Sequence, residues 1–138
     1  MNNPPPPPEK YWQLLELALA DFDEIVKDPN YVINMGFYHD GVVDGTCLVC
    51  LAGSVMARTL HANRNKRYCT GDFPDWQRAL TSISNMALGG EPLNLPKEHE
   101  KAFWKFQEPI QDKPHGADPV HWRVHMDKVV QWLKERDL

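Results

Sequence analysis

The feature that most constrains this 138-residue chain is an almost wholly apolar stretch over residues 47–57. Apart from the thiols of Cys47 and Cys50, the hydroxyl of Ser54 is its only polar side-chain group. A helix that is apolar on every face is buried on every face. We therefore expect a central helix from about residue 46 to residue 61. Its small residues would let neighbouring helices approach closely.

Four further segments repeat apolar residues at helical spacing, and proline or glycine marks their ends. Such segments form amphipathic helices that bury one face against a common core. With the central helix they predict a mainly all-α fold, an irregular bundle of about five helices. The four segments are residues 9–27, 72–88, 96–108 and 118–138.

Residues 31–45 do not share this helical pattern. Three glycines interrupt the segment, and short extended pieces lie between them. A short hairpin that turns at Asp40-Gly41 is one interpretation. Irregular structure is the other.

The N-terminus carries five consecutive prolines at positions 4–8. Such a run is extended and makes no internal hydrogen bonds. We expect residues 1–8 to be a flexible, proline-rich leader, and residues 9–138 to form a single helical domain. A ligand for a proline-recognition groove is the alternative interpretation of the leader.

Charge and composition exclude several classes of protein. The formal net charge is −4, which makes nucleic acid an unlikely partner. No apolar run is long enough to span a membrane, and the N-terminus lacks the pattern of a signal peptide. The odd number of cysteines, three, argues against a disulfide framework. We therefore expect a cytoplasmic protein that does not interact with membranes.

Motifs for cofactor binding and catalysis are missing from the sequence. It has no phosphate-binding glycine loop, no dinucleotide fingerprint and no Gly-x-Ser-x-Gly nucleophile turn. The sequence therefore predicts no cofactor and no catalytic residues, and it favours a non-enzymatic role.

The densest cluster of positive charge lies in residues 58–68. Such a cluster is able to bind a phosphate, a nucleotide, a nucleic-acid backbone or an acidic protein. A solvated loop is the alternative interpretation. Because the polar face of segment 9–27 is acidic, we expect a dipolar surface. The candidate binding residues are Arg58, Arg64, Lys66, Arg67 and Tyr68.

Four residues form a candidate zinc site: Cys47, Cys50, His61 and Cys69. The Cys-x-x-Cys spacing occurs in zinc modules, and on a helix it places both thiols on one face. However, the pair lies in the most apolar part of the chain, where free cysteines serve as ordinary core residues. A zinc-stabilised module therefore remains an alternative.

His121 and His125 lie one helical turn apart, a spacing that also binds metal. In zinc proteases a glutamate follows the first histidine, whereas Trp122 occupies that position here. Two histidines on the polar face of an amphipathic helix are the simpler interpretation.

Part of the chain, about residues 33–57, resembles small uncharacterised proteins of bacteria and their phages. Those proteins carry a Phe-x-Met segment and then Cys-Gly-Thr, two residues, and Cys-Ile/Leu-Ala-Gly. This sequence has Ile33-Asn34-Met35, Gly45-Thr46 and Cys50-Leu51-Ala52-Gly53. It departs from the pattern at Asp44, which replaces the first cysteine, and by one extra residue before Cys50. The resemblance implies a prokaryotic or phage setting and a buried Cys-Leu-Ala-Gly helix, but no function.

Together these features predict a non-enzymatic accessory protein that binds a host protein or protein complex. The resemblance adds a phage-encoded inhibitor of a host factor or defence complex, similar to anti-CRISPR proteins only in its general profile. A binder of small anions, nucleotides or nucleic acid through residues 58–68 is the first alternative, and the zinc-stabilised module is the second. The chain is also a possible homo-oligomer.

Overall fold

The apolar stretch of the sequence is divided between a strand and a helix. The computed structural model describes residues 4–41, 45–108 and 119–138, with the side chains of residues 119–121 left out. Strand β3 is Cys47–Val49 and helix α2 is Leu51–Arg58. The predicted helix 46–61 was therefore wrong in its first part, although its burial is confirmed. A central strand and a central helix are both apolar on all sides, so composition does not distinguish them.

A three-stranded sheet surrounds β3. Strand β1 (Tyr31–Ile33) pairs with it in parallel and β2 (His39–Gly41) pairs with it antiparallel, so the strand order is β1-β3-β2. The fold is mainly helical but not purely all-α. Of the two interpretations of residues 31–45, irregular structure was wrong for Tyr31–Ile33 and His39–Gly41, which are strands. A hairpin that turns at Asp40-Gly41 was also wrong, because both residues lie inside β2. A Cβ atom on Gly41 would lie 2.6 Å from the carbonyl oxygen of Arg64, so this glycine permits a close packing contact.

The four amphipathic segments form helices where the sequence predicts them. Two short 3₁₀ turns, η1 (Thr70–Asp72) and η2 (Pro74–Trp76), precede the third helix. Pro74 opens η2, a position that suits proline. A backbone N–H in the first turn of a helix has no partner within the helix, so nothing is lost when proline lacks it. The four helices are α1 (Tyr11–Val26), α3 (Gln77–Ala87), α4 (Lys97–Phe106) and α6 (Pro119–Glu135).

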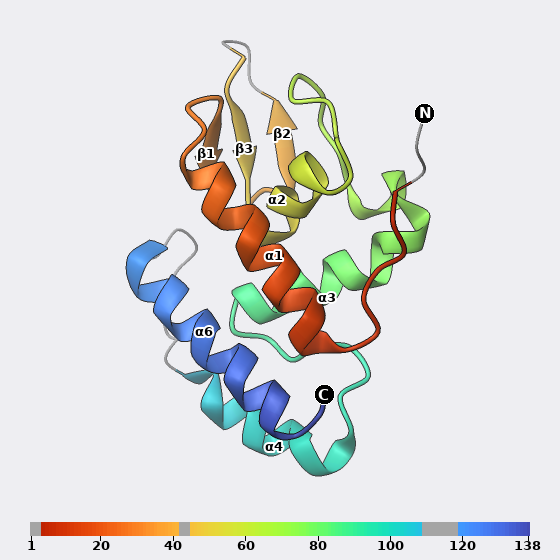
Figure 1. The fold of residues 1–138 in the computed structure, drawn as a ribbon, viewed down its shortest axis with the longest axis vertical. Helices are drawn as coiled ribbons and strands as arrows, with labels where there is room; N and C mark the ends of the chain where they lie inside the picture. The colour runs from red at the N-terminus through yellow and green to blue at the C-terminus, as the bar shows by residue number, and fades with distance from the viewer. Residues whose placement is uncertain (1–3, 42–44, 109–118) are drawn as a thin grey trace.

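Helix α1 joins the two ends of the molecule. Figure 1 shows the sheet and α2 at one end, α4 and α6 at the other, and α1 running between them. Helix α1 packs against α2, α3 and α6. Its Phe22 ring lies 4.7 Å from the ring of Trp122 in α6, which fixes these helices together. Beside the sheet, Ile25, Cys47 and Val49 form a second, smaller apolar cluster.

The proline-rich leader contacts the body of the protein. The carbonyl oxygen of Pro5 accepts a hydrogen bond of 2.8 Å from the indole N–H of Trp76. Pro7 and Pro8 are half-buried, and the leader runs beside the segment that opens α3 (Figure 1). Residues 1–3 lie outside the described part, and the flexibility expected of residues 1–8 stays a prediction.

A search of the described helices for a membrane span found none with the length and apolar character to cross a bilayer.

Candidate functional site

A closed turn at residues 63–68 carries most of the predicted basic cluster. The side-chain oxygen of Asn63 accepts a hydrogen bond of 2.9 Å from the N–H of Asn65. Its carbonyl oxygen accepts another, of 3.0 Å, from the N–H of Lys66. The hydroxyl of Tyr68 closes the segment by accepting a bond of 3.2 Å from the N–H of Asn63. Local side-chain bonds of this kind hold a turn in one conformation.

Strand β2 holds this turn in place. The N–H of Tyr68 donates to the carbonyl oxygen of His39 at 2.9 Å. The Nδ1 atom of His39 lies 3.1 Å from the carbonyl oxygen of Lys66, and the two rings of His39 and Tyr68 meet edge to face at 5.1 Å. Because His39 is only 1% exposed, the turn rests on a fixed, buried support.

Three cations of this turn have no carboxylate partner among the described residues. Lys66 and Arg67 are exposed, and Arg64 is half-buried. Within the part of the chain that the structure describes, none of the three forms an ion pair. The Nε atom of Arg64 is buried and has no hydrogen-bond acceptor. We call Arg64, Lys66 and Arg67 the basic turn.

The other two residues of the predicted cluster serve different roles. The Nε atom of Arg58 lies 3.6 Å from Oδ1 of Asp21, so its charge faces helix α1. The ring of Tyr68 packs 5.5 Å from the ring of Phe73 and supports the turn from inside. Three of the five predicted residues therefore lie on one turn as cations without an ion pair in the described part of the chain.

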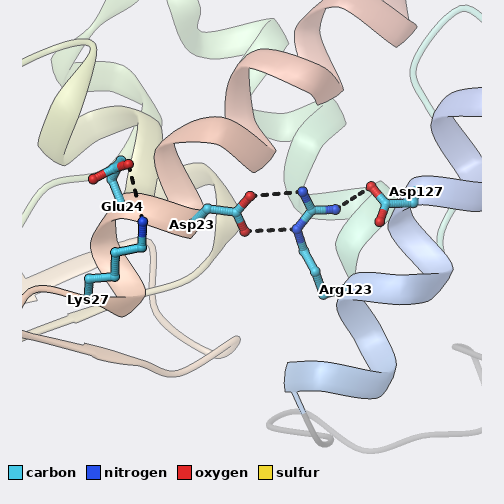
Figure 2. Close-up of polar contacts among 5 residues, drawn as sticks. All are labelled: Asp23, Glu24, Lys27, Arg123 and Asp127. Atoms are coloured by element: carbon cyan, nitrogen blue, oxygen red, sulfur yellow. Dashed lines mark hydrogen bonds and ion pairs between the residues drawn. The ribbon is translucent and has the colours of Figure 1, made fainter.

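The acidic face of α1, in contrast, is compensated by neighbouring cations. Arg123 of α6 makes two bonds of 2.9 Å to the carboxylate of Asp23 and also contacts Asp127, as Figure 2 shows. Glu16 pairs with Lys134 in the same way across α1 and α6. The negative half of the expected dipolar surface is thus largely neutralised, whereas the basic turn is not.

The surroundings shift the pKa values of two carboxylates of this face in opposite directions. The bidentate guanidinium of Arg123 lowers the pKa of Asp23. Burial raises the pKa of Asp21, although a hydrogen bond of 2.6 Å from the hydroxyl of Thr59 and the charge of Arg58 act in the other direction.

The candidate zinc ligands are not gathered into a site. Cys47 and Cys50 are buried, whereas His61 and Cys69 are exposed. Over residues 4–41, 45–108 and 119–138, no three His, Cys, Asp or Glu residues lie together as metal ligands would. The two thiols do not share a helix face as expected, because Cys47 lies in β3 and Cys50 is the residue before α2.

A buried histidine–cysteine contact was missed by the sequence analysis. The sulfur of Cys47 lies 3.5 Å from both ring nitrogens of His39. A sulfur in line with one N–H would lie much closer to one nitrogen than to the other. Burial raises the pKa of the Cys47 thiol to about 11 and lowers the pKa of His39. The pair is therefore held neutral, which is the opposite of an activated thiolate nucleophile.

No sequence signal points to this role of His39. Its partners Lys66 and Tyr68 belong to a loop far along the chain, and short-range spacing contains no information about such contacts. The nearest local indication is Gly41, whose missing side chain lets the backbone of residues 64–65 pack against β2. In the sequence this glycine was interpreted as part of a turn.

The histidines of α6 also differ from expectation. His125 is buried, and its Nε2 atom lies 2.8 Å from the side-chain oxygen of Gln107. The amide of Gln107 in turn donates to the carbonyl oxygen of Met86 at 3.1 Å. The polar-face interpretation was therefore wrong for His125, which joins a buried polar network. The side chain of His121 lies outside the described residues.

No protein-family model, curated protein or solved structure matches this chain.

Proposed function

We propose that the protein is a non-enzymatic binding protein that docks through its basic turn on an acidic surface of a partner protein. The observation that carries this proposal is a turn, held by the buried His39, whose three cations meet no carboxylate in the described ranges 4–41, 45–108 and 119–138. Most other arginines of the described chain, in contrast, meet a carboxylate.

The energetics of Arg64 favour an anionic partner. The Nε–H of Arg64 is buried and out of reach of a partner, whereas the guanidinium as a whole is only half-buried. A carboxylate of the partner would accept charge-assisted hydrogen bonds from the outer N–H groups of this guanidinium. Because the turn is already closed by its own hydrogen bonds, little conformational entropy would be lost in ordering it on binding.

The exposed cations Lys66 and Arg67 would act at longer range. Charges at the rim of an interface mainly accelerate association and select the sign of the partner's surface. Their contribution falls as salt is added, because the Debye length shortens. The proposed interface is therefore sensitive to ionic strength.

The proposal extends to a biological setting through the resemblance of residues 33–57 to bacterial and phage proteins. In that setting the partner is a host factor or a defence complex, and the protein inhibits it by occupying an acidic surface. The neutral state of the Cys47–His39 pair favours such stoichiometric binding over chemistry at that pair.

A charge-matched pair of variants tests the basic turn. In the first, Arg64, Lys66 and Arg67 are each changed to glutamine. In the control, three exposed lysines of α4 without ion pairs in the described chain are changed instead: Lys97, Lys101 and Lys105. Both variants lose three positive charges, one set from the basic turn and the other from α4.

The measurement is retention of bacterial host proteins on each immobilised variant over a series of salt concentrations. We expect the basic-turn variant to lose the partner retained by the native protein, by about tenfold or more in affinity. The α4 variant should retain it. Equal retention by the two variants would assign binding to net charge or to another surface.

A small anion is the second candidate ligand, because the half-buried guanidinium fork of Arg64, with Lys66 and Arg67 on the same turn, suits a phosphate or a nucleotide. Native mass spectrometry of gently purified protein separates the two cases. An added mass that disappears in the basic-turn variant would establish a small ligand. A bare polypeptide mass would leave the acidic protein surface as the proposed partner.

A further inference from the structure

The proline-rich leader lies on an aromatic surface of its own chain. Trp76 is 1% exposed and is among the largest fully buried side chains. Its indole N–H donates to the carbonyl oxygen of Pro5, the acceptor found for it within the described residues. A leader that departs would leave this N–H without its acceptor, and a buried unpaired donor is unfavourable.

Two cavities flank the contact between the leader and Trp76. One, of about 230 Å³, lies between Pro4 and the aromatic pair of Phe73 and Trp76. The other, of about 440 Å³, lies between Pro7–Pro8 and helix α3 and is also lined by Tyr11. The leader therefore does not fill the surface on which it lies.

This combination has the chemistry of polyproline recognition. In a polyproline II helix the carbonyl groups have no internal partners, so they are free to accept hydrogen bonds from a receptor. Grooves lined by aromatic rings bind such segments with little loss of conformational entropy, because the segment is already extended. Here Tyr11, Phe73 and Trp76 provide the rings, and Trp76 also provides the donor.

The larger cavity also indicates what should follow the prolines. Glu9, the first acidic residue after the leader, lines this cavity together with Arg78 of α3 and Asp75 of η2. Among the described residues Glu9 and Arg78 form no ion pair, but the basic side chain of Arg78 complements a carboxylate that follows a proline run, and the carboxylate of Asp75 acts against it. The seated leader thus defines the class of ligand: consecutive prolines followed by an acidic residue.

We propose that the surface formed by Tyr11, Phe73, Trp76 and Arg78 is a polyproline-binding groove that takes a proline-rich, acid-flanked segment of a partner protein. The leader is its resident occupant in cis and competes with that segment. A tethered ligand has a high effective concentration, so the native chain binds a free peptide weakly. This groove involves none of the residues of the basic turn, and its occupancy does not depend on the function proposed above.

The test uses the full chain with a weakened leader. Changing Pro5, Pro6 and Pro7 to glycine removes the preorganised extended conformation and should release the leader. A fluorescent peptide with the sequence of residues 2–10 is then titrated against native and variant protein, and binding is followed by anisotropy. We expect the glycine variant to bind at least about tenfold more tightly than the native chain.

Two comparisons establish how the peptide is bound. A peptide with alanine in place of its five prolines should bind at least about tenfold more weakly, because it is not preorganised. Changing Trp76 to phenylalanine in the glycine background should weaken binding about fivefold, through loss of the indole hydrogen bond. If the phenylalanine variant fails to fold, the alanine peptide still decides the proposal.

Three results would overturn the proposal of a polyproline-binding groove. The first is no binding of the proline peptide to the glycine variant at millimolar concentration. The others are that the alanine peptide binds the glycine variant as tightly as the proline peptide does, or that the folded phenylalanine variant binds the proline peptide as tightly as its glycine parent. A native chain that forms dimers which the glycine variant does not form would also overturn it, since the leader would then occupy the groove of a second copy.

Discussion

Charged groups are paired at the contact between α1 and α6, at the helical end of the molecule, and unpaired on the basic turn at the sheet end. At the helical end, Arg123 bridges Asp23 and Asp127, and the buried His125 is hydrogen-bonded to Gln107. At the sheet end, the basic turn presents three cations that no carboxylate of the described chain neutralises. Paired polar groups stabilise one arrangement of helices, whereas unpaired ones are available to a partner. The difference separates the part that holds the fold from the part that we propose binds.

Helix α1 belongs to both ends, and two of its carboxylates show this. Asp21 faces Arg58 and Thr59 of the α2 segment, near the sheet. Asp23, two residues later, faces Arg123 of α6. The first is penalised by burial and the second is stabilised by its partner, so their pKa values move in opposite directions.

The largest expected effect concerns the contact of α2 with the segment between β1 and β2. A Cβ atom on Gly53 would lie 1.5 Å from the carbonyl oxygen of Tyr38, so Gly53→Ala forces backbone to move. We expect the free energy of unfolding to fall by about 3 kcal/mol or more, measured by urea denaturation. Gly71→Ala is the control, because its Cβ would meet nothing closer than 3.9 Å, and it should change stability by less than about 1 kcal/mol. Equal effects would show that α2 is free to shift.

The next effect separates the buried thiols from the exposed one. A pKa of about 11 for Cys47 and Cys50 leaves roughly one thiol in a thousand as thiolate near pH 8. Cys69 is exposed. A chromogenic disulfide reagent should therefore modify one thiol per native chain rapidly and the other two at least about a hundredfold more slowly. In denaturant all three should react together, and three rapid equivalents in the native protein would show that the sheet end opens readily.

The polar network of the helical end gives the third prediction. Gln107→Leu removes the amide that hydrogen-bonds the Nε2 atom of His125 and the carbonyl oxygen of Met86, which also accepts from the N–H of Gly89. We expect a loss of about 2 kcal/mol in the free energy of unfolding, because these buried side-chain hydrogen bonds are lost. Gln131→Leu removes an exposed amide of the same size and should change stability by less than about 0.5 kcal/mol. If Gln107→Leu left the free energy of unfolding unchanged, the network would contribute no stability.

The smallest effects come from the two carboxylates of α1, and they differ in sign. The lowered pKa of Asp23 gives the native fold stability that is present above the ordinary aspartate pKa and is lost as pH falls through the lower folded value. Asp23→Asn should therefore be less stable than the native protein near neutral pH, by under about 1 kcal/mol.

The raised pKa of Asp21 works the other way, because the native fold loses stability as pH rises through the higher folded value. Asp21→Asn should be as stable as the native protein near neutral pH, or more stable by under about 1 kcal/mol, since asparagine still accepts the Thr59 bond. For both variants the difference from the native protein should vanish in acid. Urea denaturation over a pH series measures this, and a matching sign for the two would refute the assigned environments.

The sequence by itself determined the four amphipathic helices and most of the core. Apolar spacing and proline or glycine stops depend on residues within one or two turns of each other, so α1, α3, α4 and α6 follow from local pattern. Burial of residues 47–57 followed in the same way, because a segment without polar side chains has no favourable place at the surface.

Only the tertiary structure decided how that apolar segment divides into β3 and α2, and which cations have no carboxylate partner among the described residues. A central strand differs from a central helix only through the neighbours with which it pairs, here β1 and β2. The sequence likewise does not distinguish the cations of the basic cluster from one another. In the structure Arg58 pairs with Asp21 of α1, whereas Arg64, Lys66 and Arg67 have no such partner among the described residues. The support of the turn by His39 and the seating of the leader on Trp76 are contacts of the same kind. They join residues far apart in the chain, and such pairs cannot be predicted from local periodicity.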